Sequence, residues 1–310
     1  MQLEKTQSMR SIFTIDVEDW YHILDLPATP PISKWASLPS RVEGNFLKLL
    51  AIFGEANAKA TCFFLGWIAE KYPHLVREAV GQGHEIASHG YAHRLAYEMS
   101  PKEFLEDALR SRKLIEDISG KSVWGYRASG FSVTNETPWF FDRLMQAGYR
   151  YDSSVFPATR GHGGLPNGNL APYRVDSSTD FVEFPASVER VAGKSVCFFG
   201  GGYLRLFPYR VIKSMTHRVL GQGRPVIFYV HPREVDLESP QLPMALKRRF
   251  KSYVNISTTE PKIRRILADF EMITFREFLT EAKDGQIEAR VPFTGAIPTE
   301  HDRDLGVAKV

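Results

Sequence analysis

The chain has 310 residues, of which 43% are hydrophobic and 24% are charged, a composition that suits a folded globular protein and excludes a disordered one. Its 39 basic and 36 acidic residues leave a formal charge of only +3, so no nucleic-acid partner is expected. The length allows one large α/β domain or two ordinary ones.

Apolar runs of strand type alternate with longer segments of helical periodicity, which is typical of repeated βα units around a mostly parallel sheet. The predicted strands are 11–17, 60–65, 84–88, 123–126, 181–185 and 225–230. The predicted helices are 41–56, 68–82, 101–119, 138–148, 209–220 and 260–268. Segments 156–178 and 187–204 are rich in Gly, Pro and Ser, and we expect long loops there. The pattern fits a (β/α) barrel or a doubly wound sheet.

The two ends of the chain stand outside this alternation. Residues 1–10 are predicted to be an N-terminal extension and 284–310 a loosely packed tail. The first ten residues lack the apolar stretch and cleavage site of a secretory leader, and no run of 18 apolar residues occurs. We therefore expect a cytoplasmic protein without a membrane span. Cys62 and Cys197 lie in apolar runs and are expected to be free and buried.

A basic cluster contains Lys247, Arg248, Arg249 and Lys251. We interpret it as a solvated helix face, because charge runs on exposed helices are common. Binding of an anionic glycan or a lipid phosphate is the alternative interpretation.

Two histidines in SHGYAH, His89 and His93, stand four residues apart. On a helical turn their rings would project from one face and could bind one metal ion. An open catalytic zinc site usually has three protein ligands and a water molecule, so a third ligand must come from another segment. Taken alone, such a pair is more often an ordinary surface or cap pair.

Three carboxylates, Asp16, Glu18 and Asp19, follow the first predicted strand in TIDVEDWYH. Parallel α/β folds place their active sites at such strand ends. A divalent cation would offset the repulsion between the acids, and an acid that does not bind it could act as a general base. The alternative is a solvated turn or a helix N-cap.

His231 directly follows an apolar strand in VIFYVHPREVD. The ordinary pKa of histidine, about 6.5, suits a general acid that protonates a departing amine. Arg127 and Asp152 are residue types that would orient the catalytic pair, the guanidinium beside the base and the carboxylate beside the imidazolium. Each of these three residues also has a structural interpretation, as an exposed histidine or a salt-bridge residue.

The order of these motifs resembles the polysaccharide deacetylase (NodB-homology, carbohydrate esterase) family. The similar phrases are TIDVEDWYH, GHEIASHGYAH, GYRASGFS, YDSSVFP, FGGGYLRLFPY and FYVHPREVD. They look in particular like the branch of the family found in exopolysaccharide-biosynthesis loci. The resemblance covers roughly residues 11–280, which makes 11–283 the expected catalytic domain. Five motifs in order are far more specific than any one of them.

The resemblance implies a distorted (β/α) barrel of about seven strands and a site that binds one divalent metal ion, with zinc as the first choice. Asp16 would be the general base, and His89 and His93 would bind the metal. The third ligand would be Asp19, which we favour, or Glu18. The choice arises because the family norm is a pair of adjacent aspartates, which this chain lacks.

The remaining roles are also implied by the resemblance. Arg127 would pair with the base, His231 would be the general acid, and Asp152 would tune that histidine. A backbone N–H within 128–131 would bind the oxyanion. The aromatic residues near the motifs could stack on sugar rings or belong to the core, and the candidates are Trp20, Phe131 and Tyr203.

The implied activity is hydrolytic removal of N-acetyl groups from an N-acetylhexosamine in an exopolysaccharide or its precursor. An N-acetylated glycan is therefore the expected partner, and the oligomeric state is not predicted. Two alternatives stay open: an amidohydrolase of a small cyclic amide or ureide, and a glycan-binding pseudoenzyme without turnover.

Overall fold

The computed structural model of the chain describes residues 10–24, 26–159, 163–176, 178–282 and 287. The predicted N-terminal extension and tail, 1–10 and 284–310, lie almost entirely outside the described residues. Of the helices described, none is both long and apolar enough to cross a bilayer. Cys62 and Cys197 are free and buried, as predicted.

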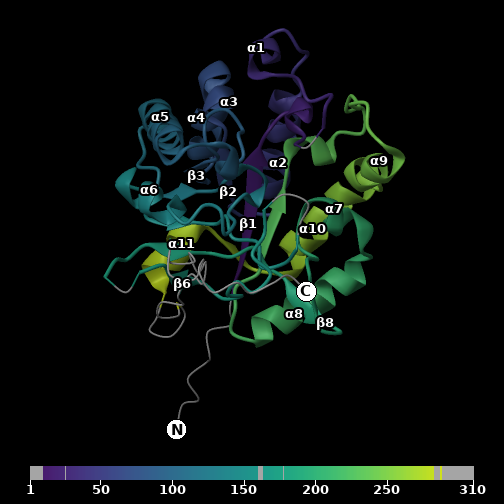
Figure 1. The fold of residues 1–310 in the computed structure, drawn as a ribbon. Helices are drawn as coiled ribbons and strands as arrows, with labels where there is room; N and C mark the ends of the chain where they lie inside the picture. The colour runs from purple at the N-terminus through teal and green to yellow at the C-terminus, as the bar shows by residue number, and fades with distance from the viewer. Residues whose placement is uncertain (1–9, 25, 160–162, 177, 283–286, 288–310) are drawn as a thin grey trace, which may run out of the picture.

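A sheet of nine strands forms the centre of the fold (Figure 1). The strands are β1 (Ser11–Val17), β2 (Thr61–Phe64), β3 (Glu85–Ser88), β4 (Gly125–Tyr126), β5 (Tyr151–Asp152), β6 (Tyr173–Arg174), β7 (Val182–Glu183), β10 (Ile227–Val230) and β11 (Met272–Ile273). Their order is β10-β1-β2-β3-β4-β5-β7-β6, with β11 beside the start of β1. Among the described strands of this sheet, β6 and β7 pair antiparallel and the other pairs are parallel. A separate hairpin contains β8 (Glu189–Val191) and β9 (Lys194–Val196).

This strand order decides between the two architectures that the sequence leaves open. From β1 to β5 each strand lies beside its predecessor, whereas a doubly wound sheet reverses at a switch point. β10 then returns to the other side of β1. Among the described residues β10 and β6 do not pair with each other, so the sheet is an open, distorted (β/α) barrel, as expected.

Helices cover the outside of the sheet (Figure 1). They are α1 (Ile32–Trp35), α2 (Val42–Glu55), α3 (Gly66–Lys71), α4 (Pro73–Gly81), α5 (Pro101–Ser119), α6 (Phe140–Gln146), α7 (Gly201–Leu206), α8 (Tyr209–Gly221), α9 (Leu246–Tyr253), α10 (Thr259–Asp269) and α11 (Phe275–Glu281). Short 3-10 turns are η1 (Trp20–His22), η2 (Ala96–Glu98), η3 (Ser129–Phe131), η4 (Pro232–Val235) and η5 (Ile256–Thr258).

Most predicted elements occur where expected, and the differences have local causes. The predicted helix 68–82 is two helices, α3 and α4, because Pro73 cannot donate a backbone hydrogen bond to the preceding turn. The start of α5 is sharp because Ser100 and Glu103 form a reciprocal capping box. Segment 187–204, expected to be a loop, contains the β8–β9 hairpin and the beginning of α7.

The register of the sheet places the ends of its strands at one level. Ile15 lies opposite Val230, so the next residues, Asp16 and His231, are neighbours across β1 and β10. On the other side of β1 the strand ends are also level: Phe64 of β2 lies opposite Ser88 of β3, and Ser88 lies opposite Tyr126 of β4. The residues that follow these strands therefore meet at the carboxyl edge of the sheet.

Replacing Gly125→Ala should destabilise the fold. A Cβ at this position in β4 would overlap the ring of Tyr151, which is fully buried and held by a 2.9 Å hydrogen bond to Glu85. We expect the free energy of unfolding to fall by about 1–3 kcal/mol, measured by urea unfolding. The control Gly44→Ala in α2, where nothing lies within 4 Å of the new methyl group, should raise it by about 0.5–1 kcal/mol. Wild-type stability of Gly125→Ala would contradict this account.

Candidate active site

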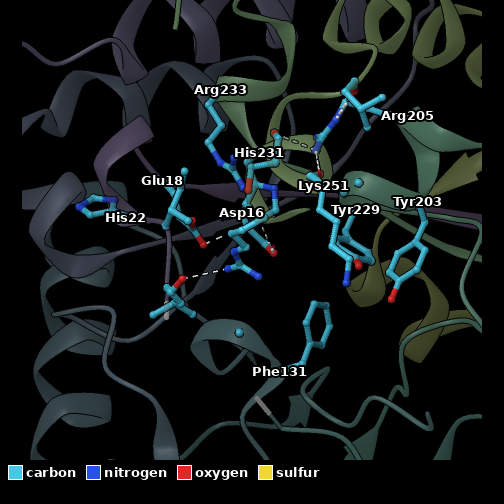
Figure 2. Close-up of a pocket in the computed structure, with 18 of the residues that line it drawn as sticks. Asp16, Glu18, His22, Phe131, Tyr203, Arg205, Tyr229, His231, Arg233 and Lys251 are labelled. Atoms are coloured by element: carbon cyan, nitrogen blue, oxygen red, sulfur yellow. Dashed lines mark hydrogen bonds and ion pairs between the residues drawn. The ribbon is translucent and has the colours of Figure 1, made fainter. Parts of the chain in front are cut away.

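Five of the polar residues predicted at strand ends line one cavity of about 430 Å³ (Figure 2). Asp16 belongs to β1 and Glu18 follows that strand directly. His89 and His93 come from the loop after β3, and His231 comes directly after β10. The sheet therefore brings together side chains that are more than 200 residues apart in the chain.

Glu18, His89 and His93 form a cluster that could hold a metal ion. Their ligand atoms all lie within 4.8 Å of one another. A single carboxylate oxygen, Oε1 of Glu18, lies 3.0 Å from Nε2 of His89 and 2.9 Å from Nε2 of His93. Nδ1–H of His89 donates to the carbonyl of Arg127 at 2.7 Å, which leaves Nε2 as the ligand atom.

The two histidines are not on a helical turn. Residues 89–93 form an irregular loop after β3, in which Gly90 and His93 both have positive φ, 72° and 53°. A left-handed conformation is unfavourable for histidine and is retained mainly where the side chain must face one direction. A bent loop, and not a helical turn, therefore brings the two imidazole rings together, so the helical interpretation of this spacing is wrong.

The preference for Asp19 as third ligand is wrong, because its carboxylate serves as the N-cap of η1. Its oxygens accept hydrogen bonds from Trp20 N at 2.8 Å, Ser40 Oγ at 2.5 Å and Arg41 N at 3.2 Å. In extended chain, alternate side chains share a face, so Asp16 and Glu18 point into the cavity and Asp19 points away. The N-cap alternative is thus the correct one for Asp19.

Electrostatics favour an ionised Glu18. Burial alone would raise the pKa of its carboxyl group. The charges of His93 and His231 and the hydrogen bonds from both His89 and His93 outweigh burial and hold that pKa well below its usual value. A buried carboxylate between two imidazoles is a suitable donor set for a divalent transition metal.

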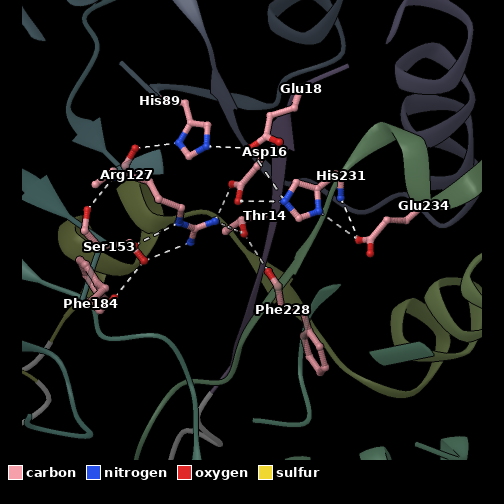
Figure 3. A network of polar contacts seen from close by, with 12 residues as sticks. Thr14, Asp16, Glu18, His89, Arg127, Ser153, Phe184, Phe228, His231 and Glu234 are labelled. Carbon is pink, nitrogen blue, oxygen red and sulfur yellow. Dashed lines mark hydrogen bonds and ion pairs between the residues drawn. The ribbon is translucent and has the colours of Figure 1, made fainter. Parts of the chain in front are cut away.

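Asp16 forms a buried ion pair with Arg127, as predicted. Nη1 of Arg127 lies 2.7 Å from Oδ1 of Asp16 and 2.7 Å from the hydroxyl of Thr14. The rest of the guanidinium binds the carbonyl and hydroxyl of Ser153, both at 3.1 Å (Figure 3). The other Asp16 oxygen faces Nε2 of His231 at 4.0 Å. The ion pair thus directs one oxygen of Asp16 towards the cavity.

His231 is oriented by Glu234, a residue that the sequence analysis did not single out. Oε2 of Glu234 lies 3.3 Å from Nδ1 of His231 and accepts its backbone N–H at 3.1 Å (Figure 3). The other Glu234 oxygen forms a buried ion pair with Arg205. Burial lowers the pKa of His231 to about 4, although the charge of Glu18 opposes this shift. Glu234 could have been found from the sequence, because it stands three residues after His231 with a proline directly after the histidine, which is the pattern of a helix N-terminus closed by a capping box.

Asp152 does not tune His231, which corrects that prediction: the described residues contain no hydrogen bond or ion pair between them. The Asp152 carboxylate accepts hydrogen bonds from Ser154 N at 3.1 Å and Ser154 Oγ at 2.6 Å, and lies against Glu183. Ser154 Oγ in turn accepts from Ala128 N at 2.7 Å. Asp152 therefore supports the start of segment 128–131 from behind.

Segment 128–131 reaches the cavity through η3. Gly130 and Phe131 line the cavity and both have positive φ, 64° and 54°. Because Gly130 has no side chain, its backbone is what lines the cavity. That a backbone N–H of this segment binds the oxyanion remains a prediction.

The aromatic candidates divide into two groups. Phe131 and Tyr203 line the cavity, as expected for residues that stack on sugar. Trp20 does not line it, because its ring packs edge-on against Tyr21 and its Nε1–H donates to the carbonyl of Pro39 at 2.9 Å. Trp20 thus belongs to a small core cluster beside the site.

His22 is a further cavity residue that the sequence analysis missed. Its ring is 1% exposed and lines the cavity next to His93, with the ring centroids 5.6 Å apart. Nδ1 of His22 accepts the backbone N–H of Asp19 at 3.0 Å, so the proton of the neutral ring is on Nε2. Burial lowers the pKa of His22 well below its usual value. No local pattern distinguishes this histidine from an ordinary core residue.

Replacing Glu183→Gln should reduce the pH dependence of stability. Burial raises the pKa of Asp152 to about 6 and that of Glu183 well above its usual value. The folded state therefore binds more protons than the unfolded state above roughly pH 4, and wild-type stability falls as the pH rises through the folded pKa values. The variant lacks the repulsion between two carboxylates, so urea unfolding should show it more stable than wild type at pH 8 by about 1–3 kcal/mol.

At pH 5 the same variant and the wild type should differ little. The exposed Glu136→Gln is the control and should follow the wild-type pH profile. If Glu183→Gln keeps the full wild-type pH dependence, the two carboxyl groups do not interact as described.

Two sequence profiles match this chain. The family described as polysaccharide deacetylase matches residues 38–151, and a domain of unknown function, DUF3473, matches residues 153–280. The peptidoglycan deacetylase of Helicobacter pylori is 32% identical over 108 residues, which is 35% of this chain and 36% of that protein. A peptidoglycan-N-acetylglucosamine deacetylase of Bacillus cereus is 30% identical over 73 residues, 24% of this chain and 26% of that protein. The match thus spans about a third or less of these two relatives.

Solved structures share the fold over most of the chain. A Mycobacterium smegmatis protein assigned as a polysaccharide deacetylase superposes with a TM-score of 0.63 at 18% identity, covering 94% of this chain and 96% of that one. A Pseudomonas aeruginosa protein with the same assignment superposes with a TM-score of 0.54 at 16% identity, covering 86% and 88%. The chain therefore shares its fold with these two proteins, and its residues 38–151 match the polysaccharide deacetylase family.

Proposed function

We propose that this protein is a metal-dependent hydrolase that removes N-acetyl groups from an N-acetylhexosamine in an exopolysaccharide or its precursor. One observation carries the proposal: Nε2 of His231 lies 4.0 Å from Asp16 and 3.9 Å from Glu18, beside both histidines of the cluster. A candidate base, a candidate acid and three candidate metal ligands therefore face one cavity. The names of the curated relatives, which act on peptidoglycan, support a glycan substrate.

The residues present fit a divalent metal. Glu18, His89 and His93 offer one oxygen and two nitrogens, a set that catalytic zinc sites use while leaving a position open. When bound there, a divalent ion would polarise the acetamide carbonyl and make water more acidic. Zinc is the first choice because two histidines and one glutamate are a ligand set of known catalytic zinc sites.

The protein's own residues would move the protons. Asp16, directed by Arg127, would accept a proton from the water that attacks the acetamide carbon. His231 is neutral at pH 7 because its pKa is about 4, so it must receive the proton that it donates. Asp16, 4.0 Å away, can supply that proton, and Glu234 stabilises the resulting imidazolium through Nδ1. The C–N bond then breaks as His231 protonates the amine, which yields acetate and an amino sugar.

Substrate selection would depend on the cavity wall. Phe131 and Tyr203 offer aromatic faces for sugar rings, and the polar groups of the site lie at the base of the cavity. A small cyclic amide or ureide would gain little from such an open wall, so we favour a glycan. A cytoplasmic location, proposed from the sequence, would suit a precursor before export.

Asp16→Asn and His231→Ala should each lower acetate release from N-acetylglucosamine oligomers by about 10²–10⁴-fold, because each removes a proton-transfer group. A chelator should abolish the activity, and zinc should restore it. His74→Ala, which changes an exposed histidine outside the cavity, is the control and should keep wild-type activity. Release that survives both substitutions and the chelator would contradict the proposed function, and turnover of ureides alone would favour the amidohydrolase alternative.

Glu18→Gln should lower zinc affinity by more than about 100-fold, measured by competition with a chromophoric chelator, because a metal ligand is lost. Asp19→Asn is the matched variant and should retain zinc while losing about 1 kcal/mol of unfolding free energy, because an amide nitrogen cannot accept the hydrogen bonds that Arg41 N and Val42 N donate to Oδ2. The reverse pattern, with zinc lost only in Asp19→Asn, would show that the third ligand is misassigned.

A further inference from the structure

The wall of the cavity carries cations that the deacetylation chemistry does not use. Arg233 belongs to η4, and Arg248 and Lys251 belong to α9, yet all three line the same cavity as Asp16 and Glu18. Figure 2 shows Arg233 and Lys251 around the hollow that contains His231. The basic cluster of the sequence is thus partly a wall of the site, and its interpretation as a purely solvated helix face is incomplete.

These three cations form no close pair with a described carboxylate, although the charge of Glu18, which already lies between His89 and His93, acts on Arg233. In the part of the chain that the structure describes, Arg233, Arg248 and Lys251 form no ion pair. The buried Nε atoms of Arg233 and Arg248 also have no hydrogen-bond partner among the described residues. By contrast, the buried arginines 127 and 205 pair with Asp16 and Glu234.

Among the described residues, the carboxylates that line the cavity are Asp16 and Glu18, and both have other partners. Asp16 binds Arg127, and Glu18 lies between His89 and His93. The α9 side of the cavity consequently has an excess of positive charge.

The cations of α9 are held in place by the fold. Arg205 caps the end of the helix by donating to the carbonyls of Lys251, Ser252 and Val254 at 3.0–3.1 Å. Nη2 of Arg248 donates to the carbonyl of Leu24 at 2.9 Å, which fixes the guanidinium in the wall of the cavity. A fixed guanidinium edge suits the oxygens of a carboxylate or a phosphate.

We propose that the glycan substrate carries an anionic group, a carboxylate or a phosphate, near the acetamido sugar, and that Arg233, Arg248 and Lys251 bind it. This inference rests on the proposed deacetylase function and names its substrate class. The exposed ring of Phe250 lines the cavity between the two cations of α9 and offers an apolar surface to the same sugar. An uncharged chitin-like oligomer would leave all three cations without a partner.

Two matched pairs of oligosaccharides test the proposal by isothermal titration calorimetry. The first pair is a hyaluronan tetrasaccharide, which contains glucuronate, and the same molecule with its carboxylates reduced to alcohols. The second pair is N-acetylglucosamine 1-phosphate and N-acetylglucosamine. We expect at least about tenfold tighter binding of the charged member in one pair, and that pair identifies the anion as carboxylate or phosphate.

The double variant Arg248→Gln/Lys251→Gln should lose this preference while keeping its affinity for the neutral member and its unfolding midpoint. Lys247→Gln removes one positive charge from α9 at a residue that does not line the cavity, so this variant should keep the preference. Equal affinity for both members of each pair, no binding of any of them, or a preference that survives the double variant would overturn the proposal. Binding to phosphatidylglycerol vesicles without any preference among the sugars would also overturn it, in favour of a membrane surface.

Failure of this inference is distinguishable from failure of the proposed function. Acetate release from neutral oligomers without any charge preference would overturn the anionic substrate and leave the deacetylase intact. Tight binding of a charged oligosaccharide without any acetate release, with zinc bound, would support the anion site and overturn the deacetylase.

Discussion

The buried ion pair between Arg127 and Asp16 is the interaction on which the rest of the site depends. The guanidinium of Arg127 is fully buried and also binds Thr14 and Ser153, so it joins β1 to the segment after β5. The backbone carbonyl of Arg127 accepts a hydrogen bond from His89 and so orients that ring. Removing one partner of such a pair leaves an uncompensated charge in the interior, which typically costs about 3–5 kcal/mol. The positions of the candidate base Asp16 and the candidate metal ligand His89 therefore both depend on Arg127.

A second buried arginine, Arg205, supports the acid side of the site in the same way. It pairs with Glu234, which holds His231, and it also caps the end of α9. The candidate base and the candidate acid are thus each backed by one buried guanidinium with several hydrogen bonds. This arrangement links the position of His231, the candidate acid, to α9, the helix that carries two of the three cations.

The sequence predicts which strand ends carry the site, because hydrophobic periodicity and the start of α5 are strong local signals. The sequence does not predict which side chains contact one another at those strand ends. For the third metal ligand, the resemblance to a motif of two aspartates favours Asp19. The alternation of side chains in extended chain instead favours Glu18, because Glu18 shares a face with Asp16. The place of Asp152 depends on how β5 packs beside β7, which no local pattern reveals. Strands of two residues are too short to show any period, and the approach of α9 to the cavity is purely tertiary.

The two sides of the cavity differ in how their charges are paired. Both carboxylates that line the cavity have cationic or imidazole partners, whereas Arg233, Arg248 and Lys251 form no ion pair with any described residue. Unmatched charges in a partly buried wall lower stability, and proteins retain such features chiefly at functional sites. A ligand that bridges both sides must place an anion near α9 and an acetamide near Glu18. Specificity would then come from the spacing between two groups of one glycan, since a neutral sugar meets only half of the site.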